Sequence, residues 1–247
     1  MTRALCIANQ KGGVGKTTTA VNLAAALAKA DCDTLLVDLD PQCNATSGLG
    51  ITPTERHSLV QRQPLRESLC DTQVSRLKVL PGSRSFQDVS LLATDSGAAA
   101  MLQQHLTHGM SAFEFVLIDC PPSLGHLTRS ALAASTEVLM PIQCEYFAME
   151  GLTQMIHVIR EVMRESPNQL EFGGILLTMY DDTLELTREV DAEVRDFFGE
   201  IVFDTVIPRD VAVSEAPSHG RSVIDYAPRA RGTRAYIELC MEVLERE

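Results

Sequence analysis

The sequence predicts an α/β fold built on a mostly parallel, twisted sheet with helices on both faces. Short apolar segments alternate with longer helical patterns along the chain, which is typical of βαβ units with right-handed crossovers. A glycine-rich turn joins the first apolar segment to the first helical pattern. We see no internal repeat and no low-complexity segment in the 247 residues, and we expect one domain over residues 1–247.

The expected elements follow from the periodicity of apolar residues. Short apolar runs predict buried strands at residues 5–8, 34–37, 77–80, 115–118, 137–142 and 173–179. The helical patterns lie at residues 17–30, about 86–109, 149–163, about 185–199 and about 231–245. Residues 51–76 are polar and contain Pro53 and Pro64, so they predict an irregular connection with one short helix.

The composition restricts the environment and the partners. The formal net charge is −12, so nucleic acid and anionic membranes repel the chain on average, and binding to either requires a local basic patch. No apolar run approaches the ~20 residues of a membrane span, and the N-terminus leads directly into a strand, which does not fit a signal peptide. Seven scattered cysteines without a Cys-x-x-Cys pair favour a reducing cytoplasm over a disulfide framework or a zinc site.

The stretch from Gln10 to Thr18, with the sequence QKGGVGKTT, is the most specific signal in the chain. A glycine-rich turn before a helix forms a concavity of backbone N–H groups, and the helix dipole adds positive charge, so phosphate is the natural ligand. Lys16 would face the β- and γ-phosphates, and the Thr17 hydroxyl would bind magnesium. The alternative is a tight turn with solvated lysines, but seven specified positions between a strand and a helix favour phosphate binding.

Two features distinguish this stretch from the common P-loop pattern. Gln10 stands where that pattern has glycine, and Lys11 adds a second lysine before the paired glycines. This form resembles the deviant Walker A motif of the ParA/MinD ATPases. The resemblance implies a P-loop NTPase fold that binds ATP and Mg²⁺, with catalytic roles for Lys11 and Lys16. The implied nucleotide-binding residues of this loop are Lys11, Gly12, Gly13, Val14, Gly15, Lys16, Thr17 and Thr18.

Two aspartates follow the strand at 34–37. Ligands in open α/β sheets bind beyond the carboxyl ends of the strands, so Asp38 and Asp40 are expected near the P-loop; a solvated acidic loop is the alternative. Residues 38–44 resemble the switch loop of the same family, which implies that Asp40 orients the attacking water and belongs to the magnesium shell. The family has glycine where Cys43 stands, and a bulkier residue limits positive φ, which bears on the flexibility of the switch.

A third aspartate, Asp119, ends the strand at 115–118, as in a Walker B strand whose carboxylate lies beside magnesium. Alone, such a run is more often a plain buried strand with an acidic end. Here Pro121, Pro122 and Ser123 follow it, as in ParA proteins, and the P-loop stands in the same chain. The implied magnesium residues are therefore Thr17, Asp40 and Asp119.

The C-terminal part extends the resemblance. Residues 206–220 closely match the ParA stretch after the last strand, which implies that Pro208 and Asp210 hold the adenine. Residues 143–152 resemble a ParA segment near the dimer face, although a stripe that faces the core is the simpler interpretation of the apolar residues after it. His219 has no partner at metal-ligand spacing and is interpreted as structural. The last helix is not basic and amphipathic as in MinD proteins, which argues against membrane cycling.

The resemblance covers nearly the whole chain, is weakest over residues 51–112, and is nearest to the Soj-type ParA proteins. It implies a homodimer that forms with ATP and magnesium, in which Lys11 of each subunit reaches the phosphates of the other. It also implies non-specific binding to double-stranded DNA on the nucleoid, with hydrolysis stimulated by a ParB-type partner. Two alternatives remain. One is a ParA-like positioner of a protein cargo, such as a chemoreceptor cluster or microcompartment, that still uses the nucleoid as its matrix. The other is a nucleotide-dependent metal-cluster carrier, which would need the absent Cys-x-x-Cys.

Two departures concern DNA. Thr183 and Ala212 stand where ParA proteins of this type have arginines that contact DNA, which predicts weaker binding. The remaining candidate DNA-binding residues are Arg188, Arg209, Arg221, Arg229, Arg231 and Arg234. Scattered surface arginines are also common on a solvated face that binds nothing, and this alternative stays open.

Overall fold

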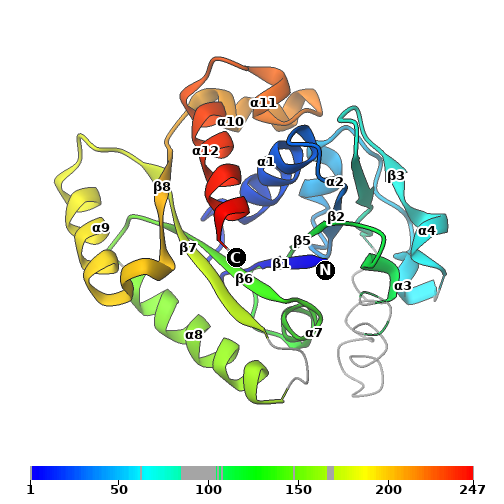
Figure 1. Ribbon diagram of the computed structural model, residues 1–247, viewed down its shortest axis with the longest axis horizontal. Coiled ribbons are helices and arrows are strands. Elements are labelled where there is room, and N and C mark those ends of the chain that lie inside the picture. The colour runs from blue at the N-terminus through cyan, green and yellow to red at the C-terminus, as the bar shows by residue number, and fades with distance from the viewer. Residues whose placement is uncertain are drawn as a thin grey trace.

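The computed structural model describes residues 2–61, 63–84, 104, 106, 108–146, 148–165 and 170–246. These residues form one eight-stranded sheet with helices on both faces (Figure 1). The strand order is β3-β4-β2-β5-β1-β6-β7-β8, and every neighbouring pair is parallel except β3 with β4. The α/β fold with a mostly parallel sheet is therefore confirmed.

The strands are β1 (Arg3–Ile7), β2 (Thr34–Asp38), β3 (Cys70–Asp71), β4 (Leu77–Leu80), β5 (Phe115–Asp119), β6 (Glu137–Gln143), β7 (Glu171–Tyr180) and β8 (Val202–Pro208). The helices of the described residues are α1 (Lys16–Lys29), α2 (Asn44–Gly48), α3 (Ser58–Gln61), α4 (Leu65–Ser68), α7 (His126–Ala134), α8 (Ala148–Glu165), α9 (Glu185–Phe198), α10 (Val211–Glu215), α11 (Val223–Tyr226) and α12 (Arg231–Glu245). Two 3₁₀ turns, η1 (Gly199–Ile201) and η2 (Ala216–His219), complete the described elements.

Most expected elements are present, and the differences are local. The edge strands β3 and β8 were not expected, and neither were the helices α2, α7, α10 and α11. Residues 206–208, which were placed after the last strand, form the end of β8. Residues 51–76 hold two short helices, α3 and α4, where one was expected. Most of the helix expected at about 86–109 lies outside the described residues. Every described helix is also too short or too polar to cross a membrane.

The sheet has an apolar core on each face. Alternate residues of β1 belong to different cores: Cys6 packs in one, while Leu5 and Ile7 pack in the other, as the period of two along a strand requires. Helices α7, α8 and α9 cover the first face, and α1 and α12 cover the second (Figure 1). Both faces of the sheet are buried, which is why its strands read as continuous apolar runs.

The C-terminal part of the chain supports the first helix. The hydroxyl groups of Thr19 on α1 and Tyr236 on α12 lie 3.5 Å apart. One turn further along α1, the side-chain oxygen of Asn22 accepts a hydrogen bond of 2.7 Å from the backbone N–H of Val223. Both contacts are buried, so residues at the two ends of the sequence hold α1 in place.

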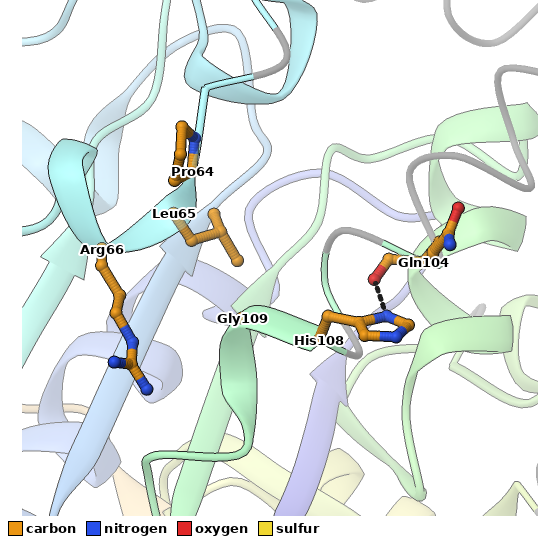
Figure 2. Close-up of a pocket in the computed structure, with 6 residues that line it drawn as sticks. All are labelled: Pro64, Leu65, Arg66, Gln104, His108 and Gly109. Atoms are coloured by element: carbon orange, nitrogen blue, oxygen red, sulfur yellow. Dashed lines mark hydrogen bonds between the residues drawn. The ribbon is translucent and has the colours of Figure 1, made fainter.

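The segment around residue 109 lies in close contact with α4. A Cβ atom at Gly109 would lie 1.9 Å from Cδ1 of Leu65, so only glycine allows the segment around residue 109 to pack against α4 (Figure 2). Beside this contact is a cavity of about 440 Å³, lined by Pro64, Leu65, Arg66, Gln104, His108 and Gly109. It shares no lining residue with the P-loop.

Candidate nucleotide-binding site

The loop between β1 and α1 has the shape that phosphate binding requires. Gly13 and Gly15 adopt φ values of +77° and +88°, which glycine reaches without steric cost. A Cβ atom built at Gly12 or Gly13 would meet nothing within 4 Å, so the loop borders open space. No side chain caps the N-terminus of α1, and its free N–H groups are available to an anion.

Two polar side chains fix this loop to the ends of neighbouring strands. Asn9 donates from Nδ2 to the carbonyl of Pro141 on β6 (2.8 Å) and accepts from the N–H of Lys11 (3.0 Å). The hydroxyl of Thr178 on β7 lies 2.9 Å from the carbonyls of both Val14 and Ile142. The loop is therefore held in place by β6 and β7, independently of any ligand.

The two lysines of the loop point in different directions. Lys16 is buried, and its Nζ donates to the carbonyl of Lys11 (2.9 Å) within the loop itself. Burial lowers the pKa of Lys16, while the carboxylates of Asp119 and Asp40 act in the opposite sense. The Nζ of Lys11 instead lies 2.5 Å from Oε2 of Glu145, which precedes α8, and both side chains are partly exposed. Lys16 thus points into its own loop, and Lys11 lies at the surface.

Two aspartates lie side by side where β2 and β5 end. Asp38 and Asp119 are paired in register on these adjacent strands, and both are fully buried. Neither oxygen of Asp119 has a hydrogen-bond partner among the described residues. Burial, followed by the charge of Asp38, raises the pKa of Asp119 well above its usual range, and the nearby Thr17 hydroxyl acts in the opposite sense.

This arrangement fits a bound magnesium ion. An unpartnered buried carboxylate is costly unless a proton or a cation compensates it. Thr17, Asp40 and Asp119 offer the hydroxyl and carboxylate oxygens that magnesium prefers. Asp40 is almost completely buried, and its Oδ1 accepts from the N–H of Gln42 (2.9 Å).

The turn after Asp40 shows why cysteine is tolerated there. Cys43 has φ +54° and ψ +34°, the left-handed conformation that glycine would adopt at this place. Its N–H donates to the carbonyl of Asp40 (2.8 Å), and its carbonyl accepts from the N–H of Ser47 (3.0 Å). The sequence indicated that a bulkier residue restricts this conformation, but the turn and the start of α2 impose it on Cys43.

The predicted adenine-binding residues lie where β7 and β8 end. Pro208 is paired in register with Tyr180, so the ends of the two strands are adjacent. The two oxygens of Asp210 accept from the N–H groups of Ala212 and Gly232, each at 2.9 Å, so this side chain connects the starts of α10 and α12. Adenine binding by Pro208 and Asp210 stays a prediction.

Three of the candidate DNA-binding arginines, Arg188, Arg209 and Arg231, lie around Asp181 and Asp182. Arg188 donates to the carbonyl of Asp182 (2.8 Å), and Arg231 donates to the carbonyl of Arg209 (3.3 Å). Hydrogen bonds from Thr183 lower the pKa of Asp181, and the charges of Arg209 and Arg231 contribute. Arg229 and Arg234 are exposed.

Arg221 lines a cavity in which none of the other five candidate arginines takes part. This cavity of about 420 Å³ lies beside the start of α1, with Thr17, Thr18, Val21, Asn22, Asn44, Ser47, Gly48, Pro217 and Ser218 as the other lining residues. The DNA-binding assignment of all six arginines remains untested by this geometry.

The sequence did not single out several residues that shape the site. Asn9 and Thr178 lie near the carboxyl ends of parallel strands, where ligands bind in open sheets. Their polar side chains at these positions could have identified them as site residues. Glu145 is 134 residues from Lys11, and no local pattern predicts their contact. His57, buried beneath the switch loop, likewise had no signal in the sequence.

Known proteins resemble the chain over nearly its whole length. A family model described as an AAA domain matches residues 2–172. The chromosome partitioning protein ParA of Myxococcus xanthus is 43% identical over 251 residues, covering 99% of this chain and 89% of that relative. The chromosome-partitioning ATPase Soj of Treponema pallidum is 43% identical over 250 residues, covering 100% and 99%. A solved structure of a Mycobacterium smegmatis protein, described as cobyrinic acid a,c-diamide synthase with bound ADP and magnesium, is 33% identical with a TM-score of 0.84, covering 99% and 94%.

Proposed function

Because the chain belongs to the ParA/Soj family of partitioning ATPases, we propose that it hydrolyses ATP in a homodimer and uses this cycle to segregate DNA. The proposed reaction is ATP plus water to ADP plus phosphate. A ParB-type partner would stimulate hydrolysis, and the ATP-bound dimer would associate with the nucleoid through non-specific contacts to duplex DNA. The geometry of the P-loop and the functions of the relatives support this proposal.

Each part of the site has a role in this reaction. The N–H groups of the P-loop and Lys16 bind the phosphates, and Thr17, Asp40 and Asp119 would hold magnesium. Magnesium bound there would neutralise charge that develops on the β- and γ-phosphates. Asp40 orients the attacking water. Lys11 of the partner subunit adds a positive charge at the transferred phosphoryl group, which lowers the barrier only once the dimer has formed.

The observation that carries the proposal is the opposite orientation of the two lysines. Lys16 is buried in the cradle, whereas Lys11 is partly exposed and paired with Glu145. A partly exposed lysine is accessible to a second subunit, whereas the buried Lys16 is not. The position of Lys11 supports delivery to a second subunit and hence a link between dimerisation and hydrolysis.

A ParA-like positioner of a protein cargo, with a matrix other than the nucleoid, is the second candidate. It is favoured by the acidic residues Asp181 and Asp182, which lie among the arginines proposed to contact DNA. Carboxylates in such a patch repel phosphate and reduce the counterions released on binding.

The experiment that tests the proposal compares dimerisation and duplex binding in three nucleotide states. Light scattering measures the mass of the protein with a non-hydrolysable ATP analogue, with ADP and without nucleotide. Fluorescence anisotropy measures binding to a random-sequence duplex under the same conditions. Dimers and DNA binding that occur only with the analogue are expected. A monomer in all three states would contradict the proposal, and an ATP-dependent dimer that ignores DNA would favour the second candidate.

A further inference from the structure

A buried polar network lies directly beneath Asp40. The carboxylate of Asp38 accepts hydrogen bonds from the N–H and the hydroxyl of Thr46 (2.9 and 2.6 Å) and from the N–H of Asp40 (3.1 Å). The Thr46 hydroxyl in turn accepts from the N–H of Gly82 (2.8 Å). Asp38, unlike Asp119, is therefore fully engaged with protein groups, and one of those groups is the backbone of Asp40.

The backbone of Gly82 lies close against this network. A Cβ atom at Gly82 would lie 2.9 Å from the carboxyl carbon of Asp38 and 3.1 Å from the sulfur of Cys43. The segment before α3 is tied to the same place, because the N–H of Thr54 donates to the carbonyl of Gly82 (3.0 Å). This segment leads to His57.

His57 completes the network from the opposite side. Its side chain is 2% exposed, and its Nε2 lies 3.3 Å from the backbone carbonyl of Asp38. Its Nδ1 lies 3.3 Å from the N–H of Leu59. An N–H group can only donate, so Nδ1 accepts and Nε2 carries the proton that is donated to Asp38. The imidazole is thus held as one neutral tautomer.

We propose that His57 is a positioning residue for ATP hydrolysis, which fixes the backbone between Asp38 and Asp40 and thereby the direction of the Asp40 carboxylate. Asp38 is held at its carbonyl by His57 and at its side chain by Thr46 and the N–H of Asp40. These hydrogen bonds restrict the peptide groups that lead to Asp40. This inference rests on the proposed role of Asp40. His57 itself touches neither the P-loop nor the proposed magnesium residues in the contacts described above.

The test separates orientation from folding and from nucleotide binding. His57→Leu keeps a side chain of similar bulk but removes the donor, and His57→Gln can place an N–H group near the carbonyl of Asp38. We expect His57→Leu to bind ATP with unchanged affinity by calorimetry while its kcat falls about tenfold, the effect of one lost hydrogen bond on a rate. His57→Gln should recover most of the rate. Leu59→Ala is the matched control, because it removes buried packing beside His57 and leaves the backbone N–H, so it should lower stability but not kcat.

Three results would overturn the inference. These are an unchanged kcat in His57→Leu, a parallel loss of kcat in Leu59→Ala, and a failure of His57→Gln to recover the rate. If the leucine variant does not fold, ¹⁵N-histidine NMR of the wild-type protein decides, because a proton on Nδ1 would remove the donor to Asp38. Asp40→Ala is measured in parallel. Wild-type turnover in Asp40→Ala would refute the role of Asp40, whereas slow turnover there with normal turnover in His57→Leu would refute only the role of His57.

Discussion

Lys11 and Glu145 form an ion pair of 2.5 Å between the P-loop and the segment before α8. The side chains are 38% and 47% exposed, and pairs of this kind contribute roughly 0–1 kcal/mol. A phosphate of a partner subunit carries more charge than one carboxylate and can therefore displace Glu145 from Lys11. The pair keeps Lys11 ordered in the monomer without preventing its use in a dimer.

The first prediction concerns Lys11. Lys11→Ala should bind ATP as a monomer, because Lys16 and the loop N–H groups remain, but it should lose ATP-dependent dimerisation and hydrolysis. Light scattering and phosphate release measure the two effects. Glu145→Gln is the companion variant: it releases Lys11, so dimers should form at lower protein concentration. A normal dimer with normal turnover in Lys11→Ala would exclude a role for this lysine across the interface.

The second prediction concerns Lys16. Lys16→Ala removes the charge that faces the phosphates, so the free energy of ATP binding should weaken by roughly 1.5–3 kcal/mol, the range for hydrogen bonds to charged groups. Isothermal calorimetry measures the change. Lys29→Ala is the control, because Lys29 lies at the other end of α1 and pairs with Asp225 at 2.6 Å. Equal ATP affinities of the wild type, Lys16→Ala and Lys29→Ala would show that this loop does not bind the phosphates.

The third prediction contrasts Asp40 with Asp38. Asp40→Ala should fold, bind ATP and dimerise but hydrolyse very slowly, because it lacks the group that orients water. Asp38→Ala should instead lower the free energy of unfolding by about 1–3 kcal/mol, since it leaves the buried donors of Thr46 without an acceptor. Urea denaturation and turnover assays separate the two variants. Loss of ATP binding in Asp40→Ala would show that Asp40 mainly holds the metal.

The fourth prediction concerns the pH dependence of stability. Burial lowers the pKa of His57 from 6.5 to about 4, so the folded state binds this proton less readily than the unfolded state does. The stability contributed by neutral His57 is fully present above pH 6.5 and is lost as the pH falls towards 4, by roughly 3 kcal/mol in total.

The difference between wild type and His57→Gln isolates this effect. Burial raises the pKa values of Asp38 and Asp119, so these two groups make the free energy of unfolding rise as the pH falls, opposite to the effect of His57. Both proteins contain these aspartates, so their effect cancels in the comparison. Urea denaturation between pH 4 and 7.5 should show the two free energies of unfolding diverging from each other below pH 6.5. Parallel curves would mean that His57 is hydrated in the folded protein.

The fifth prediction concerns DNA. The logarithm of affinity for a duplex falls with the logarithm of salt concentration, with a slope of about −0.9 per phosphate contacted. The ATP-bound dimer should bind weakly and with a shallow slope. Replacing Thr183 and Ala212 together with arginine should tighten binding and steepen the slope. Replacing the neighbouring Arg231 and Arg234 on α12 with glutamate should abolish it.

Fluorescence anisotropy across a salt series measures these slopes. Arg76→Glu is the control, because Arg76 pairs with Asp33 at the amino ends of the strands, away from the nucleotide, and should leave the slope unchanged. Tight binding that survives both glutamates would place the DNA on another surface. The absence of binding at low salt, even with the added arginines, would favour a protein cargo without DNA.

The parts of the fold that were predictable from the sequence are those with a local signal. Thr34–Asp38 is a continuous apolar run that ends in an acid, and it forms β2. Cys70–Asp71 is a strand of two residues, which is too short to show any periodicity, and its pairing with β4 depends on the rest of the sheet.

In the candidate site too, residues within a local motif could be predicted, whereas residues brought together by the fold could not. The proposed phosphate-binding residues follow each other in one motif, so Gly13, Gly15 and Lys16 could be proposed from the sequence alone. The contact of His57 with Asp38 spans 19 residues, and that of Thr178 with Val14 spans 164. Such contacts arise only when separate strands are brought to the same edge of the sheet. The left-handed backbone of Cys43 was not evident from the sequence for a related reason, because the hydrogen bonds of its turn depend on the fold around it.

The packing of α1 against the C-terminal residues has a consequence for biosynthesis. Residues 16–29 leave the ribosome long before Val223 and Tyr236, which cover one side of α1. Contacts between such distant parts of a chain form slowly, and apolar surface that waits for them is prone to aggregation. The P-loop motif is therefore synthesised early, but the helix that follows it is fully packed only after the C-terminal residues have been made. A chain that stops before α11 would contain the P-loop motif but lack the residues that pack against α1.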